Sequence, residues 1–165
     1  TKDIPVGGSG QVEMVGVVEP TILSVTMPSF VPFSIGNSLQ TPNKVISPRI
    51  KMKNNSNIPV QIDVVYTNVD LRNLPNVSWN DTGVVKPNQI AIGLKHEETL
   101  NQMPEDLSNA IWLQANRSQN LHILKLAAVQ EDAVYVVGTL GMDVSENATF
   151  NVTPTFVVKR TTLSE

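Results

Sequence analysis

The residues that come nearest to a catalytic motif are His96, Glu97 and Glu98, which begin the pattern of a zinc-protease helix. That pattern needs a second histidine one helical turn later, because two imidazoles on one helix face grip the metal. Leu100 stands at that position, and the other histidine, His122, lies in a run with strand character. The sequence therefore predicts no metal site, and we expect both histidines to make local hydrogen bonds.

Other patterns of catalysis and cofactor binding are also missing. No Gly-x-Ser-x-Gly elbow occurs, and the glycine-rich stretch at residues 7–10 precedes a strand-like segment instead of a phosphate-binding helix. The chain has no cysteine, which excludes disulfides, thiolate nucleophiles and iron–sulfur clusters. We expect no catalytic residue, no metal and no cofactor, and therefore a protein that is not an enzyme.

The charge and hydropathy patterns exclude two further classes of partner. The net charge is -3 at pH 7, and the basic residues are scattered, which argues against nucleic-acid binding. No apolar run approaches the roughly twenty residues that a membrane-spanning helix needs. Hydrophobic residues make up 41% of the chain and charged residues 16%, and Val, Ile and Thr carry much of this composition. Such a composition is typical of strands and turns.

Apolar and polar residues alternate along much of the chain, which indicates strands with one buried face. We interpret the stretch Ile46–Tyr66 as a long β-hairpin, because alternating runs flank the turn-forming residues 54–57. Residues 96–110 alone have helical character, and Pro104 limits a helix there to a turn or two. Strand-like runs recur at the spacing of a sandwich. The prediction is an all-β fold, an antiparallel β-sandwich of jelly-roll-like form, preceded by an N-terminal arm.

The first 18 residues have the layout of such an arm, and residues 19–165 are expected to form the sandwich domain. Gly7, Gly8 and Gly10 supply a candidate hinge. A β-competent segment follows the hinge, and a segment of this kind can add to the sheet edge of a neighbouring molecule. The residues that we expect to make the subunit interface, as a donor strand, are Gln11, Val12, Met14, Val15, Val17 and Val18.

Two stretches also resemble a known family. The phrase KMKNNSNIPVQIDVVY, residues 51–66, is similar to a strand, Asn/Ser turn, Pro and strand signature of secreted bacterial β-sandwich domains. The end, ATFNVTPTFVVKR, residues 148–160, resembles their closing strand. With the arm before it, the chain is most like the TasA/camelysin family of biofilm-matrix fibre proteins. The resemblance implies a secreted jelly-roll subunit whose N-terminal arm completes the sheet of the next subunit. Camelysin-like proteins have been described as metalloproteases, but this chain shows no matching metal motif.

The first functional expectation is an extracellular or cell-surface structural protein that polymerises with copies of itself into a fibre or surface layer. One alternative is a monomeric module that binds carbohydrate or cell wall. That alternative requires exposed aromatic rings near Trp79 or Trp112, whereas core packing suits these rings better. Another alternative is a jelly-roll capsid protein, although the basic arm usual in such proteins is missing, because Lys2 is the only positive side chain before Lys44.

Overall fold

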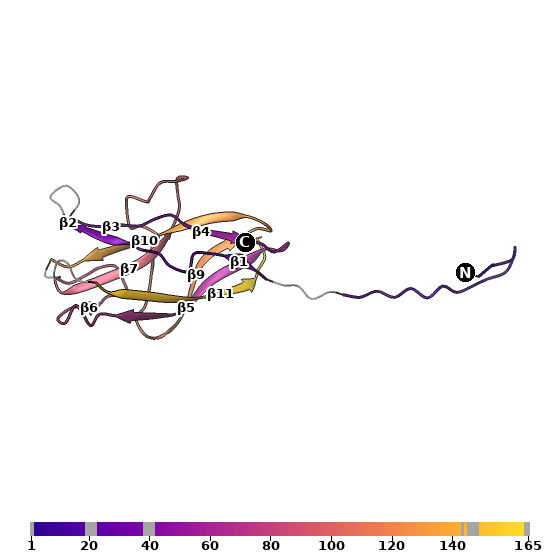
Figure 1. Cartoon of the computed structure of the whole chain (residues 1–165), viewed down its shortest axis with the longest axis horizontal. Helices are drawn as coiled ribbons and strands as arrows, with labels where there is room; N and C mark the ends of the chain where they lie inside the picture. Colours follow the sequence, from indigo (N-terminus) through magenta and orange to yellow (C-terminus); the bar gives the residue numbers. More distant parts are fainter. Residues whose placement is uncertain (1, 19–22, 38–41, 143, 145–148, 164–165) are drawn as a thin grey trace.

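The computed structural model describes residues 2–18, 23–37, 42–142, 144 and 149–163, and within them every regular element is a β-strand (Figure 1). The all-β prediction is therefore confirmed. The strands are β1 Val25–Thr26, β2 Ser34–Asn37, β3 Pro42–Ile46, β4 Ile50–Asn54, β5 Val60–Asp70, β6 Ser78–Trp79, β7 Gln89–His96, β8 Ile111–Trp112, β9 Ser118–Leu126, β10 Glu131–Leu140 and β11 Asn151–Arg160.

The strands form a sandwich of two sheets with a small ribbon beside it. One sheet has the order β1-β4-β10-β7-β6, with β8 also paired to β7, and the other has the order β11-β5-β9. The ribbon consists of β2 and β3, and Ser47 after it accepts a hydrogen bond from the amide of Val136 in β10. Among the described strands, β6 and β7 pair in parallel and the other pairs are antiparallel. The expected antiparallel β-sandwich is thus observed.

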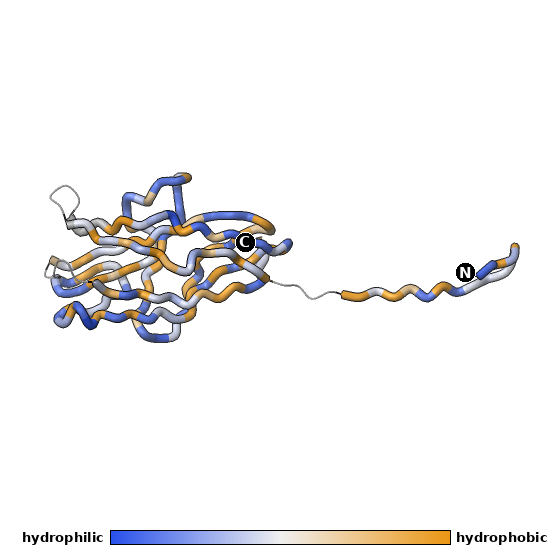
Figure 2. The backbone as a smooth tube through the Cα atoms, in the orientation of Figure 1, coloured by the Kyte–Doolittle hydropathy of each residue, from blue (hydrophilic) through white to orange (hydrophobic). Residues whose placement is uncertain are grey.

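Alternating side chains from both sheets make the core. In β4 the burial pattern alternates strictly, with Ile50, Met52 and Asn54 inward, and the long middle strands β5, β7 and β10 contribute most of the remaining core. Figure 2 shows the same alternation as apolar and polar bands along the tube. Each fully buried aliphatic side chain contributes about 1.5–3 kcal/mol relative to its exposed state. Hydrophobic burial between the sheets is therefore what holds the sandwich together.

The hairpin expected over Ile46–Tyr66 is wrong. Strand β4 pairs with β1 and β10, whereas β5 pairs with β11 and β9, so that residues 55–59 carry the chain from one sheet to the other. Buried Asn54 holds this arch, because its side-chain amide donates to the carbonyls of Ile58 and Ala127 at 2.8 and 2.9 Å. Its side-chain oxygen accepts from the amide of Ser56 at 2.8 Å. The turn-forming residues do redirect the chain here, but they connect the two sheets instead of neighbouring strands of one sheet.

No helix forms at residues 96–110. After His96 the chain leaves β7 as a long loop of turns and returns at β8. Asn101 and Asn109 adopt positive φ values of 62° and 61°, which a helix does not allow. The expected helical turn is replaced by a loop that is fixed by the two ion-pair clusters described below.

Candidate functional site

The N-terminal arm is the most unusual feature of the structure. Residues 2–18 extend away from the sandwich without forming a strand (Figure 1). Among the described residues, no hydrogen bond or ion pair joins the arm to the sandwich. Met14 is 90% exposed and Val18 is 97% exposed. An extended segment with this much exposed apolar surface has its backbone groups and side chains available for a partner.

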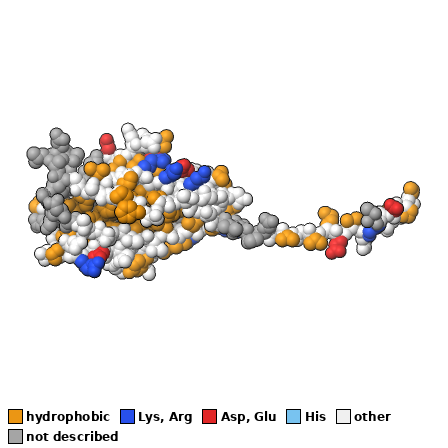
Figure 3. All heavy atoms as spheres, in the orientation of Figure 1, with side chains coloured by type: hydrophobic (Ala, Val, Ile, Leu, Met, Phe, Trp, Pro, Cys, Tyr) orange, Lys and Arg blue, Asp and Glu red, His pale blue; other side chains and the backbone are white. Residues whose placement is uncertain are grey.

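The structure places every predicted interface residue of the arm in solvent. Val12, Val15 and Val17 are exposed like Met14, and Gln11 is exposed as well. Figure 3 shows the apolar side chains of the arm standing out along the extended chain. On a strand, residues 12, 14, 16 and 18 would share one face, and residues 11, 13, 15 and 17 the other.

The candidate hinge glycines lie in a closed turn at the far end of the arm. Gly7 has a φ of +82°, and the amide of Gly8 donates to the carbonyl of Pro5 at 2.9 Å. Beyond this turn, Nζ of Lys2 donates to the carbonyl of Gln11, while a Cβ on Gly10 would lie 2.6 Å from Ile4. A bend at these glycines moves residues 2–6 and leaves residues 11–18 where they are. The glycines therefore do not join the donor segment to the sandwich.

The edge strands of the two sheets differ in length and in how deeply their inward side chains are buried. Strands β1, β6 and β8 have two residues each, and short edges of this kind discourage pairing with other chains. The three-stranded sheet has two long edges, β9 and β11. In β9, Ile123, Leu124 and Leu126 are at most 5% exposed, and Leu121 is half-buried. In β11, Val152 and Phe156 pack on the core but are only half-buried, so that β11 is the less covered long edge.

Opposite this edge lies a second segment without backbone partners. Residues 27–33 run past the core outside any strand, and no backbone hydrogen bond joins them to another described residue. Met27, Val31 and Phe33 alternate inward and are half-buried. We call the two segments together, β11 and residues 27–33, the seam. In Figure 3 hydrophobic side chains gather in a band along this face of the sandwich. The seam was not expected from the sequence, where its one signal was the proline content of both segments.

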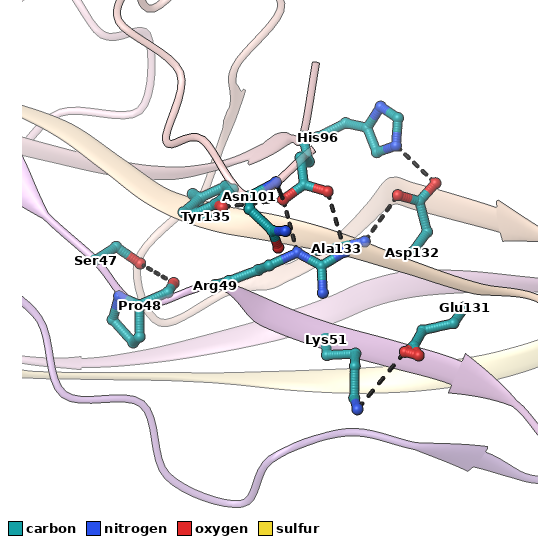
Figure 4. A network of polar contacts seen from close by, with 11 residues as sticks. Ser47, Pro48, Arg49, Lys51, His96, Asn101, Glu131, Asp132, Ala133 and Tyr135 are labelled. Carbon is teal, nitrogen blue, oxygen red and sulfur yellow. Dashed lines mark hydrogen bonds and ion pairs between the residues drawn. The ribbon is translucent and has the colours of Figure 1, made fainter. Parts of the chain in front are cut away.

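A buried ion-pair network fixes the loop after β7 to the sandwich (Figure 4). The guanidinium of Arg49 donates to both carboxylate oxygens of Glu97, at 2.7 and 3.0 Å. The hydroxyl of Tyr135 and the amide of Asn101 donate to the same carboxylate, at 2.9 and 3.1 Å. These bonds, led by that from Arg49, lower the pKa of Glu97 to about 2 despite its burial. Glu97, the second residue of the incomplete protease motif, is thus a structural anchor.

A second cluster holds the far part of the same loop. Lys95 is buried, and its Nζ lies 2.6 Å from Oδ1 of Asp106 and 3.2 Å from Oε1 of Glu98. Burial alone would lower the pKa of Lys95, but these carboxylates raise it above its ordinary value. The bond from Lys95 lowers the pKa of Asp106 to about 2. Both groups stay charged at neutral pH, so the pair acts as an ion pair and not as a nucleophile with its acid.

A third cluster lies on the outer face of the three-stranded sheet. Asp63 is 1% exposed, and it accepts hydrogen bonds from Gln61 at 2.9 and 3.1 Å. Nδ1 of His122 lies 3.2 Å from its carboxylate, and Nζ of Lys159 lies 3.1 Å away. Burial raises the pKa of Asp63, but the bonds from Gln61, Lys159 and His122 outweigh it and lower the pKa overall. The cluster ties β9, β5 and β11 together at the end of the seam.

The tryptophans do not form an exposed platform. Both are half-buried, and the indole N–H of Trp79 donates to the carbonyl of Leu113 at 2.8 Å. The ring of Trp112 lies so close to Gly83 that a Cβ there would be 2.4 Å from the ring. Tyr135 is buried, while Tyr66 is 38% exposed. The rings therefore pack against backbone, which disfavours stacking on a sugar.

The histidines are far from forming a shared site. His96 bonds Asp132 on the six-stranded sheet, while His122 bonds Asp63 on the other sheet. In the part of the chain that the structure describes, no group of three or more His, Cys, Asp or Glu side chains is placed to hold a metal ion. Across the same residues, no helix is long and apolar enough to cross a membrane.

The chain matches no protein-family model, no curated protein and no solved structure. The similarity to the TasA/camelysin family therefore stays a prediction.

Proposed function

We propose that this protein is a structural subunit that polymerises outside the cell, with its N-terminal arm completing the sandwich of the next subunit. The observation that carries the proposal is the arm itself. The apolar side chains of residues 12–18 are exposed, and no hydrogen bond among the described residues involves the backbone of these residues, although a valine-rich segment of this kind is suited to a sheet. Because each subunit both gives an arm and receives one, the contact is heterologous, and we propose that its rotation does not close a ring. Repetition of such a contact produces a filament.

The energetics favour donation of the arm to a second molecule. Burying a Val or Met side chain contributes about 1.5–3 kcal/mol, and the arm carries five such residues between positions 12 and 18. Backbone bonds along a sheet edge add specificity of register.

The test compares the full chain with a chain lacking residues 1–18, by negative-stain electron microscopy and light scattering. We expect filaments from the full chain and monomers from the shortened chain. The shortened chain should keep its cooperative unfolding transition, because no hydrogen bond or ion pair of the described residues ties the arm to the sandwich. Filaments from both chains would refute donation by the arm. Monomers from both would favour the carbohydrate- or cell-wall-binding module instead.

A further inference from the structure

The two walls of the seam run in opposite directions. At one end the rings of Phe33 and Phe150 meet edge to face, with centroids 5.8 Å apart. At the other end, Ser24 bonds residues 55 and 56, while the amide of Thr161 donates to the carbonyl of Pro59 in the same arch. Residues 24–33 therefore run antiparallel to residues 150–161. A strand inserted between them lies parallel to one wall and antiparallel to the other.

Charge selects one of the two directions. Residues 23–37 contain no charged side chain, and β11 carries only Lys159 and Arg160, at the Ser24 end of the seam. Within residues 11–18 of the arm, Glu13 is the sole charged residue. Placing Glu13 at the cationic end makes the arm antiparallel to β11. Antiparallel pairing is also slightly more stable per residue than parallel pairing.

Side-chain size then selects the register. With Glu13 opposite Lys159, the arm residues with even numbers face the core together with Phe156 and Val158. Met14 then lies opposite Val158, and Gly16, which has no side chain, lies opposite the ring of Phe156. On the solvent side Val15 meets half-buried Val157. Pro154 has no amide hydrogen, which confines the hydrogen-bonded ladder to Thr155–Arg160.

From these observations we propose that the seam of one subunit receives residues 12–18 of a second copy, antiparallel to β11, with Glu13 opposite Lys159. This inference rests on the proposed function and specifies its acceptor site. Lys159 already contacts Asp63 through one of its three N–H donors, which leaves capacity for Glu13. The half-buried residues of β11 and of residues 27–33 become covered when the arm is seated.

The chain cannot fill its own seam in this orientation. Val18 would lie opposite Pro154, seven residues of strand from Thr161, which is about 23 Å at 3.3 Å per residue. Ser24 is held at the Thr161 end, and the six residue steps from Val18 to Ser24 span about 22 Å at most. The reversal of chain direction consumes at least two residues more. The arm must therefore come from another molecule.

Cysteine pairs test the acceptor site directly, because the chain has no cysteine of its own. In this register Val17 lies opposite Thr155 on the solvent side, and both positions are exposed in the free subunit. We expect an equimolar mixture of Val17→Cys and Thr155→Cys chains, assembled and mildly oxidised, to give disulfide-linked dimers on a non-reducing gel. The matched control replaces Thr155→Cys by Asn120→Cys, which is exposed on the other long edge, β9. We expect at least about 10-fold less dimer from the control.

The outcomes distinguish failure of the seam as the acceptor site from failure of arm donation itself. Filaments with equal or stronger crosslinking to position 120 would overturn the seam as acceptor while preserving donation by the arm. Filaments without crosslinking to position 155 would likewise overturn it. Absence of filaments from the unsubstituted chain would refute the proposed function, and the seam with it. Crosslinking at position 155 above that at position 153, introduced as Thr153→Cys, would establish the register.

Discussion

Replacing Met14 with aspartate strongly weakens filament assembly and leaves the folded subunit unchanged. Met14 is 90% exposed in the free subunit, and a charge there is solvated before assembly. In the seam it would face the core opposite Val158, where an unpaired carboxylate costs several kcal/mol. We expect the critical concentration for filaments to rise at least about 100-fold, since each tenfold change corresponds to about 1.4 kcal/mol. Sedimentation of filaments over a concentration series measures the effect.

The matched control is Val6→Asp, which adds the same charge to the same arm. Val6 is fully exposed and lies in the turn beyond the donor segment, so the critical concentration should change little. Thermal unfolding of monomeric Met14→Asp should match that of the unsubstituted monomer. Equal loss of assembly in both variants would show that net charge, and not burial of residue 14, controls polymerisation.

Replacing Glu97 with glutamine lowers the free energy of unfolding by about 3 kcal/mol, the usual cost of breaking a buried ion pair. Glutamine has nearly the same shape, but it removes the charge that Arg49 faces at 2.7 Å and one of the two acceptor oxygens for the guanidinium. Urea denaturation at pH 7 measures the change. The control is Glu131→Gln, which breaks the exposed pair with Lys51 at 3.6 Å and should cost less than about 1 kcal/mol.

The lowered pKa of Glu97 also predicts how the free energy of unfolding changes with pH. The pKa of Glu97 is lowered to about 2 in the folded protein, from an ordinary value of 4.5. Its contribution to stability is therefore complete above about pH 4.5 and is lost as the pH falls towards 2. The unsubstituted protein should lose stability over this range, and Glu97→Gln should lose less. Equal slopes for the two proteins would show that the carboxylate of Glu97 is not specially stabilised by folding.

The alternation of apolar residues was sufficient to predict the fold class but not the pairing of the strands. Around residues 54–57 the sequence shows two strands and a turn, and both a hairpin and an arch satisfy that pattern. Alternation reports only that each strand has one buried face. Here the inward face of β4 includes Asn54, whose buried amide bonds the carbonyls of Ile58 and Ala127. A polar residue in phase with the buried positions was the signal for a change of sheet.

The arm could be predicted from its order and composition, whereas its acceptor could not. Residues 11–14 alternate polar and apolar after a glycine-rich stretch, residues 15–18 are Val and Gly, and that local pattern is visible in the sequence. The seam depends on Phe33 meeting Phe150 and on the arch that holds Ser24 near Thr161. Phe33 and Phe150 are more than a hundred positions apart, and Ser24 and Thr161 come together only through the arch, so no local pattern reports the seam. The role of Glu97 could not be predicted either, because its partner Arg49 lies 48 positions earlier, in the loop before β4.

The most direct test of directional arm donation is the filament length in mixtures of the full chain with the chain lacking residues 1–18. The shortened chain keeps its seam and can accept an arm, but it has none to give, and it therefore ends growth in one direction. We expect the mean length in electron micrographs to fall in inverse proportion to the fraction of shortened chain. An unchanged length distribution across the series would contradict the account, because it would mean that filaments grow without using the arm.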